Sequence, residues 1–427
     1  MTLPPLYNRL RSVLTEYAAH LQLFSRNARL YLLYVVIMGA AIGVFRLLLN
    51  FYVLSLGYDE ALLGKLVTVS SLTALLAALP AGYLADRLGR KTSLIAAGVL
   101  ISLSVFFMVL VPRTEVFYSA NMMSGFGQAL AAVTMAPFMM ENSGDKERTY
   151  LFSFSSGLRM ASASAGNWIG GYLPTWIAGS NGVDPTSSAA YAGALMIVGV
   201  TLSLALVPLF FIREPRMERS ERSVFAPISF AARQPAKLGK LILPMLLTSI
   251  GAGLIMPFMN VFFRQVHNQS DPVIGSLFAW GSLAMGIGLL LAPPLAERMG
   301  KIQLVVFTQG LSIPFLVILG FSPWFWMSAF AYYTRLSLMN MSTPIYQTFV
   351  MEQVDASSRA MVASLTSMAW NFGWAFSPAI SGWLQVSYGF GPAFVGTIIL
   401  YTISVFLYWA FFLRKGEASV TAPIPGG

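Results

Sequence analysis

Three arginines lie deep inside long apolar segments and carry the strongest chemical signal in the chain. Arg46, Arg159 and Arg335 each stand at least nine residues from either end of such a segment. A charge at the centre of a bilayer costs about 2.5–3.5 kcal/mol on insertion scales, so each guanidinium needs water, a partner or a ligand. Guanidinium groups stay protonated and bind carboxylate or phosphate bidentately. They therefore favour an anion site, with pairing to helix carbonyls as the alternative.

Acidic and imidazole side chains avoid the same segments. All 17 Asp and Glu residues fall in loops, at segment ends or in the tails, and neither His20 nor His267 is central. The interior thus offers positive charge without an obvious proton carrier. We expect uncharged polar residues to complete a substrate site with the arginines: Asn50, Gln128, Asn260 and Tyr332. Three tryptophans could line its wall, although packing or lipid-facing roles are equally open to them: Trp280, Trp370 and Trp374.

The segments that must position these residues are helices that cross a membrane. The 427 residues are 56% hydrophobic and only 10% charged, whereas a soluble protein carries about a quarter charged residues. Apolar runs of about 20 residues recur, and backbone in lipid must satisfy its own hydrogen bonds, so the runs predict helices. The alternation of a membrane β-strand is absent. We predict an all-α membrane protein with spans at 30–56, 61–85, 92–112, 116–140, 149–173, 188–212, 240–263, 272–296, 302–320, 324–350, 360–384 and 391–412.

The net charge of +10 reflects the orientation of the protein in the membrane and does not indicate nucleic-acid binding. With both termini inside, 21 of the 27 Lys and Arg residues lie on cytoplasmic segments, and only Lys65, Arg113 and Arg264 lie outside. This asymmetry follows the positive-inside rule. We therefore expect a multi-pass protein of the cell membrane with both termini in the cytoplasm.

The sequence contains no convincing motif for catalysis or for binding a metal ion. There is no cysteine, which excludes disulfides, thiolate metal sites and thiol catalysis. Gly64-Lys65 lacks the earlier glycine of a phosphate-binding loop, and Gly251-Ala-Gly253 follows no strand. We expect no catalysis, no metal and no cofactor.

Two halves of the chain repeat each other. The run Gly82-Tyr-Leu-Ala-Asp-Arg-Leu-Gly-Arg-Lys91 recurs in weaker form as Leu295-Ala-Glu-Arg-Met-Gly-Lys301, 211 residues later. The same offset relates Glu141 and Arg148 to Glu352 and Arg359, and it relates Gly166–Gly171 to Ser377–Gly382. Asn50 corresponds to Asn260 at an offset of 210, with one residue gained in the loop that follows. The three arginines break the repeat, because Arg46 aligns with Met256, Arg159 with Trp370 and Arg335 with Ser124.

The repeat and the polar stretches divide the chain into five parts. We predict a six-helix bundle at 30–212 and another at 240–413, joined by a cytoplasmic linker at 213–239. The tail at 414–427 is expected to be disordered and cytoplasmic. Residues 1–29 form a cytoplasmic leader that predicts an interfacial helix, with a frayed polar leader as the alternative. Its apolar face comprises Tyr7, Leu10, Leu14, Tyr17, Leu21 and Phe24.

The run at 82–91 resembles the signature loop between helices 2 and 3 of the major facilitator superfamily. The Glu-x6-Arg pairs and the twelve-helix layout are also similar, so the resemblance covers essentially the whole chain. It implies a secondary carrier that works by alternating access. A third motif, Gly-x3-Gly-Pro-x2-Gly-Gly of the antiporter branch, is degenerate here, since Ser162 and Asn167 replace its first glycine and its proline. Close packing of small residues is the alternative explanation for this stretch.

The resemblance also implies a gate on the cytoplasmic side. Asp86 would cap the start of helix 11 near 357–360, and Arg90 can pair with Glu141. By the repeat, Glu297 would cap helix 5, and Arg298 or Lys301 would pair near Glu352. Gly82 and Gly89 would allow a tight helix exit and re-entry. The predicted gate residues are Gly82, Asp86, Arg87, Gly89, Arg90, Glu141, Arg148, Glu297, Arg298, Glu352 and Arg359.

We therefore predict a secondary transporter that moves a small anionic solute through an arginine-lined central cavity. The expected partners are this solute and the lipid bilayer, and we expect a monomer. One alternative is a proton-coupled exporter of lipophilic compounds. Another is a membrane sensor or scaffold that does not transport, although retention of Asp86, Arg90, Glu141 and Arg148 favours a moving carrier. The sequence leaves the substrate, the direction of transport and the coupling ion open.

Overall fold

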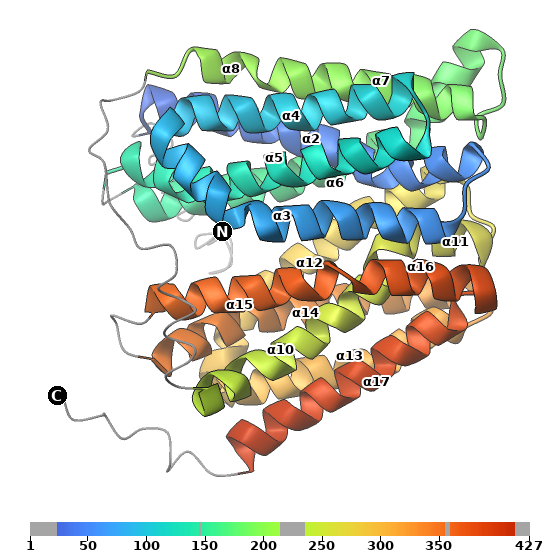
Figure 1. Ribbon diagram of the computed structural model, residues 1–427. Helices are drawn as coiled ribbons and strands as arrows, with labels where there is room; N and C mark the ends of the chain where they lie inside the picture. Colours follow the sequence, from blue (N-terminus) through green and yellow to red (C-terminus); the bar gives the residue numbers. More distant parts are fainter. Residues whose placement is uncertain (1–23, 145–146, 214–234, 355–358, 415–427) are drawn as a thin grey trace, which may run out of the picture.

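The computed structural model describes residues 24–144, 147–213, 235–354 and 359–414, and within these ranges the chain is helical with no strand. The leader up to residue 23, most of the predicted linker and the tail after 414 lie outside the described residues. The helices form two bundles that correspond to the two predicted halves (Figure 1).

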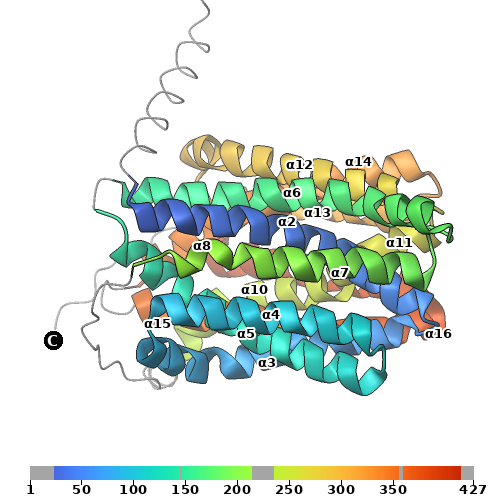
Figure 2. The same cartoon turned by 90° about the horizontal axis from the view of Figure 1, so that it is seen from above.

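The N-terminal half contains six rods of membrane-spanning length. They are α2 (Arg26–Ser55), α3 (Glu60–Leu88), α4 (Arg90–Leu110), α5 (Thr114–Glu141), α6 (Arg148–Asn181), and α7 (Ser188–Ala205) with α8 (Val207–Phe210). After a break at Leu206, α8 continues α7 nearly in line (Figure 2). Several rods run beyond the predicted spans because polar residues continue the helix at its ends.

The C-terminal half repeats this arrangement, with two rods broken. Its elements are α10 (Pro235–Ile255), η1 (Met256–Phe258), α11 (Met259–Gln265), α12 (Asp271–Met299), α13 (Lys301–Phe321), α14 (Phe325–Glu352), α15 (Arg359–Trp374), α16 (Ser377–Tyr388), α17 (Gly391–Tyr408) and the π-helical η3 (Trp409–Leu413). The spans predicted at 240–263 and 360–384 are therefore interrupted, the first by η1 and the second at Ala375 and Phe376.

Local sequence explains where several helices begin and end. The side chains of Ser25, Asp59 and Ser187 each accept a hydrogen bond from a backbone amide in the first turn of α2, α3 and α7. Gly89 separates α3 from α4 with φ 85°, and Gly300 separates α12 from α13 with φ 91°. Other residues rarely adopt such angles, so this pair gives the repeat a common turn.

Eight of the described rods meet the length and hydropathy expected of a membrane span. The other four are α5, α6, α14 and the broken rod α15–α16. Three of these four carry an arginine, a tryptophan or both in their central turns. A helix that keeps polar residues on a face away from lipid has a lower mean hydropathy, which accounts for the difference.

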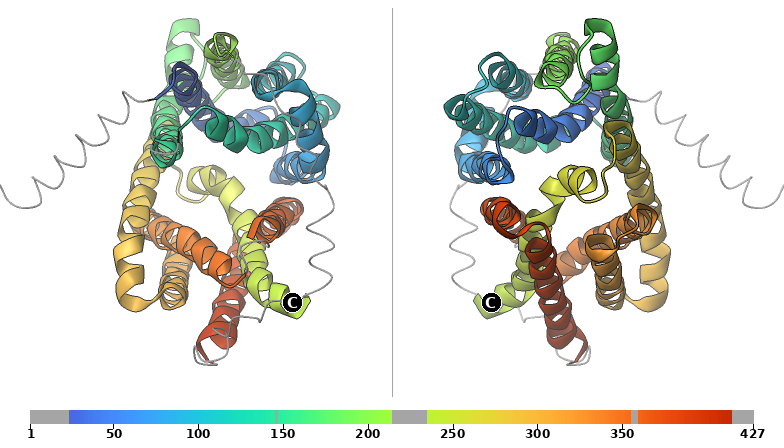
Figure 3. Two further views of the ribbon diagram at one scale, coloured as in Figure 1. Left: turned by 90° about the vertical axis from the view of Figure 1, so that its left-hand side faces the viewer. Right: turned by 90° about the vertical axis from the view of Figure 1, so that its right-hand side faces the viewer.

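The two halves meet along two seams. One seam joins α6 to α12 and the other joins α3 to α16, on opposite flanks of the molecule (Figure 3). Small residues allow the close approach, since a Cβ built on Gly275 of α12 would lie 2.5 Å from the Asn167 carbonyl oxygen of α6. We call the end of the bundle where α2 begins and α8 finishes the linker end. The other end, which contains the loops after α2 and α11, is the far end.

The buried core is continuous between the halves only toward the far end. One large cluster of buried side chains includes Leu47 and Phe51 of α2 together with Phe258 and Phe262 of the other half. At the linker end the described core divides into separate clusters, one around Tyr346 in the C-terminal half and one of small residues between α3, α4 and α5. The halves are thus packed together at the far end and distinct at the linker end.

Candidate functional site

A cavity of about 670 Å³ lies within the C-terminal half, between α10, α13, α14, α15 and α17. Along α14 its wall extends from Arg335, near the middle of the rod, to Met351 at the linker end. Its volume lies within the range of ligand pockets, about 300–1,000 Å³. The surface mixes methionines and aromatic rings with uncharged polar groups such as Gln309, Asn340 and Gln347.

Arg335 is the charged residue of this wall, and only 2% of it is exposed. Its Nη2 donates a hydrogen bond to the Tyr401 hydroxyl at 3.1 Å, and its Nη1 lies 4.0 Å from the sulfur of Met256. Its Nε is buried and has no hydrogen-bond partner among the described residues. No described residue that lines the cavity is acidic, so the guanidinium charge is not neutralised there.

Arg46 and Arg159 come from the adjacent helices α2 and α6 of the N-terminal half. Both side chains are accessible, and neither has a hydrogen bond or ion pair with a described residue. The like charge of Arg159 acts on Arg46. Their repeat counterparts, Met256 and Trp370, line the cavity of the other half. Both arginines therefore occupy positions that the repeat relates to the cavity wall of the other half.

Gln128 of α5 also has a repeat counterpart in the cavity wall of the other half. Its side-chain nitrogen lies 3.2 Å from the Ser124 hydroxyl and 3.4 Å from that of Ser70, and the residue is exposed. Its repeat counterpart is Met339, and the counterpart of Ser124 is Arg335, and both of these line the cavity. Gln128 thus lies at the position that the repeat relates to the cavity wall of the other half.

Asn50 and Asn260 do not line the cavity, because they bind each other. The Asn50 amide donates to the Asn260 side-chain oxygen at 2.9 Å and to the Pro257 carbonyl at 2.7 Å, and Asn260 donates to the Leu47 carbonyl at 2.7 Å. Both residues are buried. These two polar residues of the predicted substrate site instead join the halves toward the far end.

Tyr332 also lies away from the cavity. Its ring packs edge-on to Phe263, 5.7 Å between centroids, and against Phe278 at the same centroid distance. It therefore belongs to an aromatic core at the far end.

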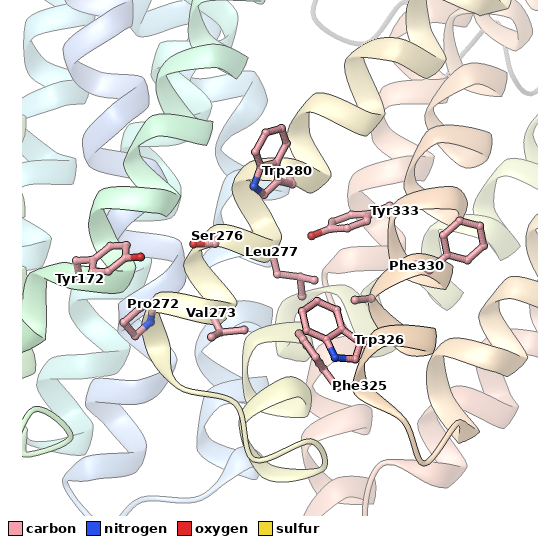
Figure 4. A pocket seen from close by; sticks show the side chains of 11 residues that line it. Tyr172, Pro272, Val273, Ser276, Leu277, Trp280, Phe325, Trp326, Phe330 and Tyr333 are labelled. Atoms are coloured by element: carbon pink, nitrogen blue, oxygen red, sulfur yellow. The ribbon is translucent and has the colours of Figure 1, made fainter.

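Of the three tryptophans, Trp370 and Trp374 line the cavity, whereas Trp280 does not. Trp280 belongs to a separate surface groove of about 390 Å³ formed by α6, α12 and α14 near the far end (Figure 4). Tyr172 and Tyr333 lie on opposite sides of this groove, and Trp326 projects into it. Its described lining contains no charged residue.

A buried ionic cluster at the far end was missed by the sequence analysis. Arg264 of α11 forms an ion pair with Asp271, the first residue of α12, and donates to the Tyr191 hydroxyl at 2.7 Å. The Tyr191 hydroxyl in turn donates to Asp271 at 2.7 Å. Tyr191 belongs to α7, so the cluster crosses the two halves. We call these three residues the far-end clasp. The sequence feature that could have indicated it is the pair of opposite charges, Arg264 and Asp271, on either side of the short loop between α11 and α12.

The clasp is one of several contacts that close the far end. The Arg264 guanidinium carbon lies 3.4 Å from the centroid of the Phe51 ring of α2, a cation–π contact across the halves. Gln265 donates to the Glu60 carboxylate of α3 at 2.5 Å. In the loop that follows α11, burial among aromatic rings lowers the pKa of His267.

The predicted gate is only partly assembled in this conformation. Arg90 donates to Asp86 at 2.8 Å and to Glu141 at 3.1 Å, and at the repeat position Lys301 pairs with Glu352. All of these contacts stay within one half. The residues that Asp86 was expected to cap, 357–360, include 357 and 358, which lie outside the described residues, and the side chains of Arg359 and Ala360 are not described either.

The remaining gate residues show different environments. Arg87 lies over the ring of Tyr83 at 5.0 Å, and Arg148 donates to the Ser143 carbonyl at 3.5 Å. Glu297 and Arg298 are exposed, and neither pairs with a described residue. Gly82 does not form the predicted helix exit, because α3 continues to Leu88 and space around it is open.

The glycines at 166–171 serve helix packing. A Cβ on Gly166 would lie 2.1 Å from the Ala40 carbonyl oxygen of α2, and one on Gly171 would lie 2.6 Å from the Asp271 carbonyl oxygen of α12. This stretch therefore brings α6 close both to its own bundle and to the other half.

Similarity to known proteins agrees with this architecture. The chain is 24% identical over 398 residues to the multidrug resistance protein MdtG of Dickeya zeae, covering 90% of this chain and 94% of that protein. It is 20% identical over 370 residues to the quinolone resistance protein NorA of Staphylococcus aureus, covering 83% and 89% of the two chains.

Solved structures share the fold at low sequence identity. A bacterial homologue of the human lysosomal transporter Spinster, in an inward-facing and occupied conformation, superposes with a TM-score of 0.75 at 15% identity, covering 94% of this chain and all of that one. The nucleoside transporter NupG gives a TM-score of 0.71 at 14% identity, covering 92% of this chain and all of that one. The family model described as Major Facilitator Superfamily matches residues 30–249 and again 241–426. The chain is therefore a multi-pass membrane transporter that belongs to the major facilitator superfamily.

Proposed function

We propose that this protein is a secondary active transporter that moves a small organic anion by alternating access. The observation that carries the proposal is the charge distribution along the path. Arg46, Arg159 and Arg335 all stand at mid-helix, and the only buried acid among the described residues, Asp271, sits at the far end, where it pairs with Arg264. An anion at mid-depth would neutralise charge that the described protein leaves unpaired.

The distribution of contacts between the halves supports alternating access. The far end is closed by the clasp and by the Asn50–Asn260 pair, while the gate contacts at the linker end remain within each half. The basic residues gather on the linker-end loops, so we place that end in the cytoplasm of a cell-membrane protein. The conformation described here then corresponds to an inward-facing carrier.

A second candidate is export of lipophilic compounds. It is favoured by the names of the relatives, a multidrug resistance protein and a quinolone resistance protein. The methionine and aromatic wall of the cavity suits such compounds, because flexible thioethers adapt to varied shapes. The two candidates differ in the substrate charge that they require.

Charge movement in proteoliposomes tests the choice. We would present three probes that share one ring system: naphthalene-2-sulfonate, naphthalene-2-methanol and naphthalene-2-methylammonium. We expect protein-dependent current with the sulfonate alone, and its loss in Arg46→Gln. The matched control is Arg113→Gln, which removes an exposed arginine from the loop between α4 and α5, outside the cavity and the predicted gate. Current with the ammonium probe and none with the sulfonate would reject the anion proposal in favour of the second candidate.

A further inference from the structure

Two buried hydrogen-bond donors in the C-terminal cavity have no partner among the described residues. They are Nε of Arg335 and the indole Nε1 of Trp374. Both residues line the cavity. Buried polar groups in proteins are nearly always hydrogen-bonded, and a buried charge without a counter-charge is costly. Two unsatisfied donors on residues that line one cavity therefore indicate a ligand that accepts hydrogen bonds.

The Tyr401 hydroxyl adds a third donor, beside Arg335. Its oxygen accepts the hydrogen bond from Arg335, which leaves its own hydrogen available. Tyr401 is buried and lines the same cavity. One positive charge and several donors, with no acid on the described wall, match a carboxylate, sulfonate or phosphate group.

The position of these donors coincides with two interruptions of the helices. Met256, which contacts Arg335, opens the 3-10 turn between α10 and α11. Trp374 ends α15 directly before the break that separates it from α16. Interrupted helices near the middle of a bundle are where transporters of repeated architecture place their substrates. The donors thus lie at the mid-bundle end of the cavity.

The rest of the cavity is shaped for an apolar body. From Arg335 to Met351 the wall follows α14 for 16 residues, a rise of about 24 Å. Beyond the donors this wall contains uncharged polar groups and a larger set of apolar and aromatic side chains. The latter include Met245, Met339, Met351, Trp370, Tyr346 and Tyr408. A small inorganic anion would leave most of this surface without contact.

We propose that Arg335, Trp374 and Tyr401 form the subsite for the charged head of an amphipathic organic anion. The apolar body of this anion lies along the methionine and aromatic wall, directed toward the linker end. The assignment rests on the proposed function and deepens it, because it names the residues that take the charge and requires an apolar body as well.

Calorimetric titration of the purified full-length protein tests this assignment. The probes are naphthalene-2-sulfonate, methanesulfonate, which has the charge without the body, and naphthalene-2-methanol, which has the body without the charge. We expect each of the last two to bind at least about tenfold more weakly than the first. Octane-1-sulfonate serves as a second amphipathic anion of different shape.

Three variants measure separately what the charge of Arg335, its planar guanidinium geometry and the indole donor of Trp374 contribute to binding. Arg335→Gln should weaken naphthalene-2-sulfonate binding by at least about tenfold, and Arg335→Lys should weaken it by less. Trp374→Phe keeps an aromatic ring and should weaken binding about threefold or more. Matched controls are Arg113→Gln and Trp326→Phe, both exposed and outside the cavity, which should bind as the unmodified protein does. Unchanged melting temperatures would show that the variants fold.

The possible failures are distinguishable. If sulfonate, alcohol and ammonium forms of the naphthalene probe bind equally, the anion transport proposal itself is wrong. If the sulfonate is preferred but Arg335→Gln and Trp374→Phe bind it normally, the subsite is wrong. Loss of binding in Arg46→Gln or Arg159→Gln would then show that the anion binds at the N-terminal arginines, and the proposed anion transport would be retained. If neither naphthalene-2-sulfonate nor octane-1-sulfonate binds, or if methanesulfonate binds as tightly, the amphipathic assignment is overturned.

Discussion

The Tyr191 hydroxyl donates a 2.7 Å hydrogen bond to the carboxylate of Asp271, and this bond crosses from one half of the transporter to the other. Arg264 binds both residues, and its guanidinium covers the ring of Phe51. The cluster therefore holds four helices together at the far end. Since hydrogen bonds to charged groups contribute about 1.5–3 kcal/mol, it is strong enough to bias the equilibrium between two carrier conformations.

Tyr191→Phe should favour the conformation that is open at the far end. It removes one donor to Asp271 and leaves the ring packing in place. Loss of a hydrogen bond to a charged group costs about 1.5–3 kcal/mol, so the ratio of far-end-open to far-end-closed molecules should rise by about tenfold or more. Spin labels on cysteines introduced at Asp184 and Ser322, in far-end loops of the two halves, would report the distance change. Tyr118→Phe is the control, and an unchanged distance distribution in Tyr191→Phe would remove the clasp from the gating mechanism.

Asp86→Asn should have the opposite effect. It keeps the side-chain shape but removes the charge that we expect to cap helix 11 when the linker end closes. Molecules should therefore accumulate in the linker-end-open conformation, with reduced transport and near-normal expression. Labels on cysteines introduced at Ser143 and Gln353 would measure the separation of the halves at that end. If the separation and the transport rate both stay normal, Asp86 serves only the topology of the loop.

His267 should make the folded protein less stable in acid. Burial lowers the pKa of His267 in the folded state, while the unfolded chain titrates near about 6.5. Between the lowered and the unfolded pKa the unfolded chain binds more protons, so stability is lost as pH falls through this window. The melting temperature should drop between pH 7.5 and 5.5, and His267→Gln should make that drop smaller. An equal drop in both proteins would assign the acid sensitivity to other groups.

Surface labelling on intact cells should distinguish the two ends. Because the chain has no cysteine, single cysteines at Ser223 and Asn268 give an unambiguous reading. An impermeant thiol reagent should label Asn268→Cys and leave Ser223→Cys unlabelled until the cells are opened. Labelling of Ser223→Cys on intact cells would invert the orientation and, with it, the assignment of the present conformation as inward-facing.

Much of the architecture could be predicted from the sequence, because it depends on local and repeated properties. The lipid environment forces apolar runs into helices, so the approximate bounds of most rods follow from the apolar runs, although only eight of them reach the hydropathy of a typical span. We expected Arg90 to pair with Glu141 and, by the repeat, either Arg298 or Lys301 to pair near Glu352. The structure has the Arg90–Glu141 and Lys301–Glu352 ion pairs. The backbone turns at Gly89 and Gly300 also share one conformation, as the spacing indicates.

Only the tertiary structure decided which polar residues face the cavity and which close the molecule. Asn50 and Asn260 have the composition of a binding site, yet each is the other's hydrogen-bond partner across the halves. The Tyr191–Arg264–Asp271 clasp joins residues 80 positions apart in the chain, and Trp374, the last residue of α15, lines the cavity. Sequence periodicity defines a face of one helix, but the partner of that face depends on how separate helices pack, which no single segment encodes.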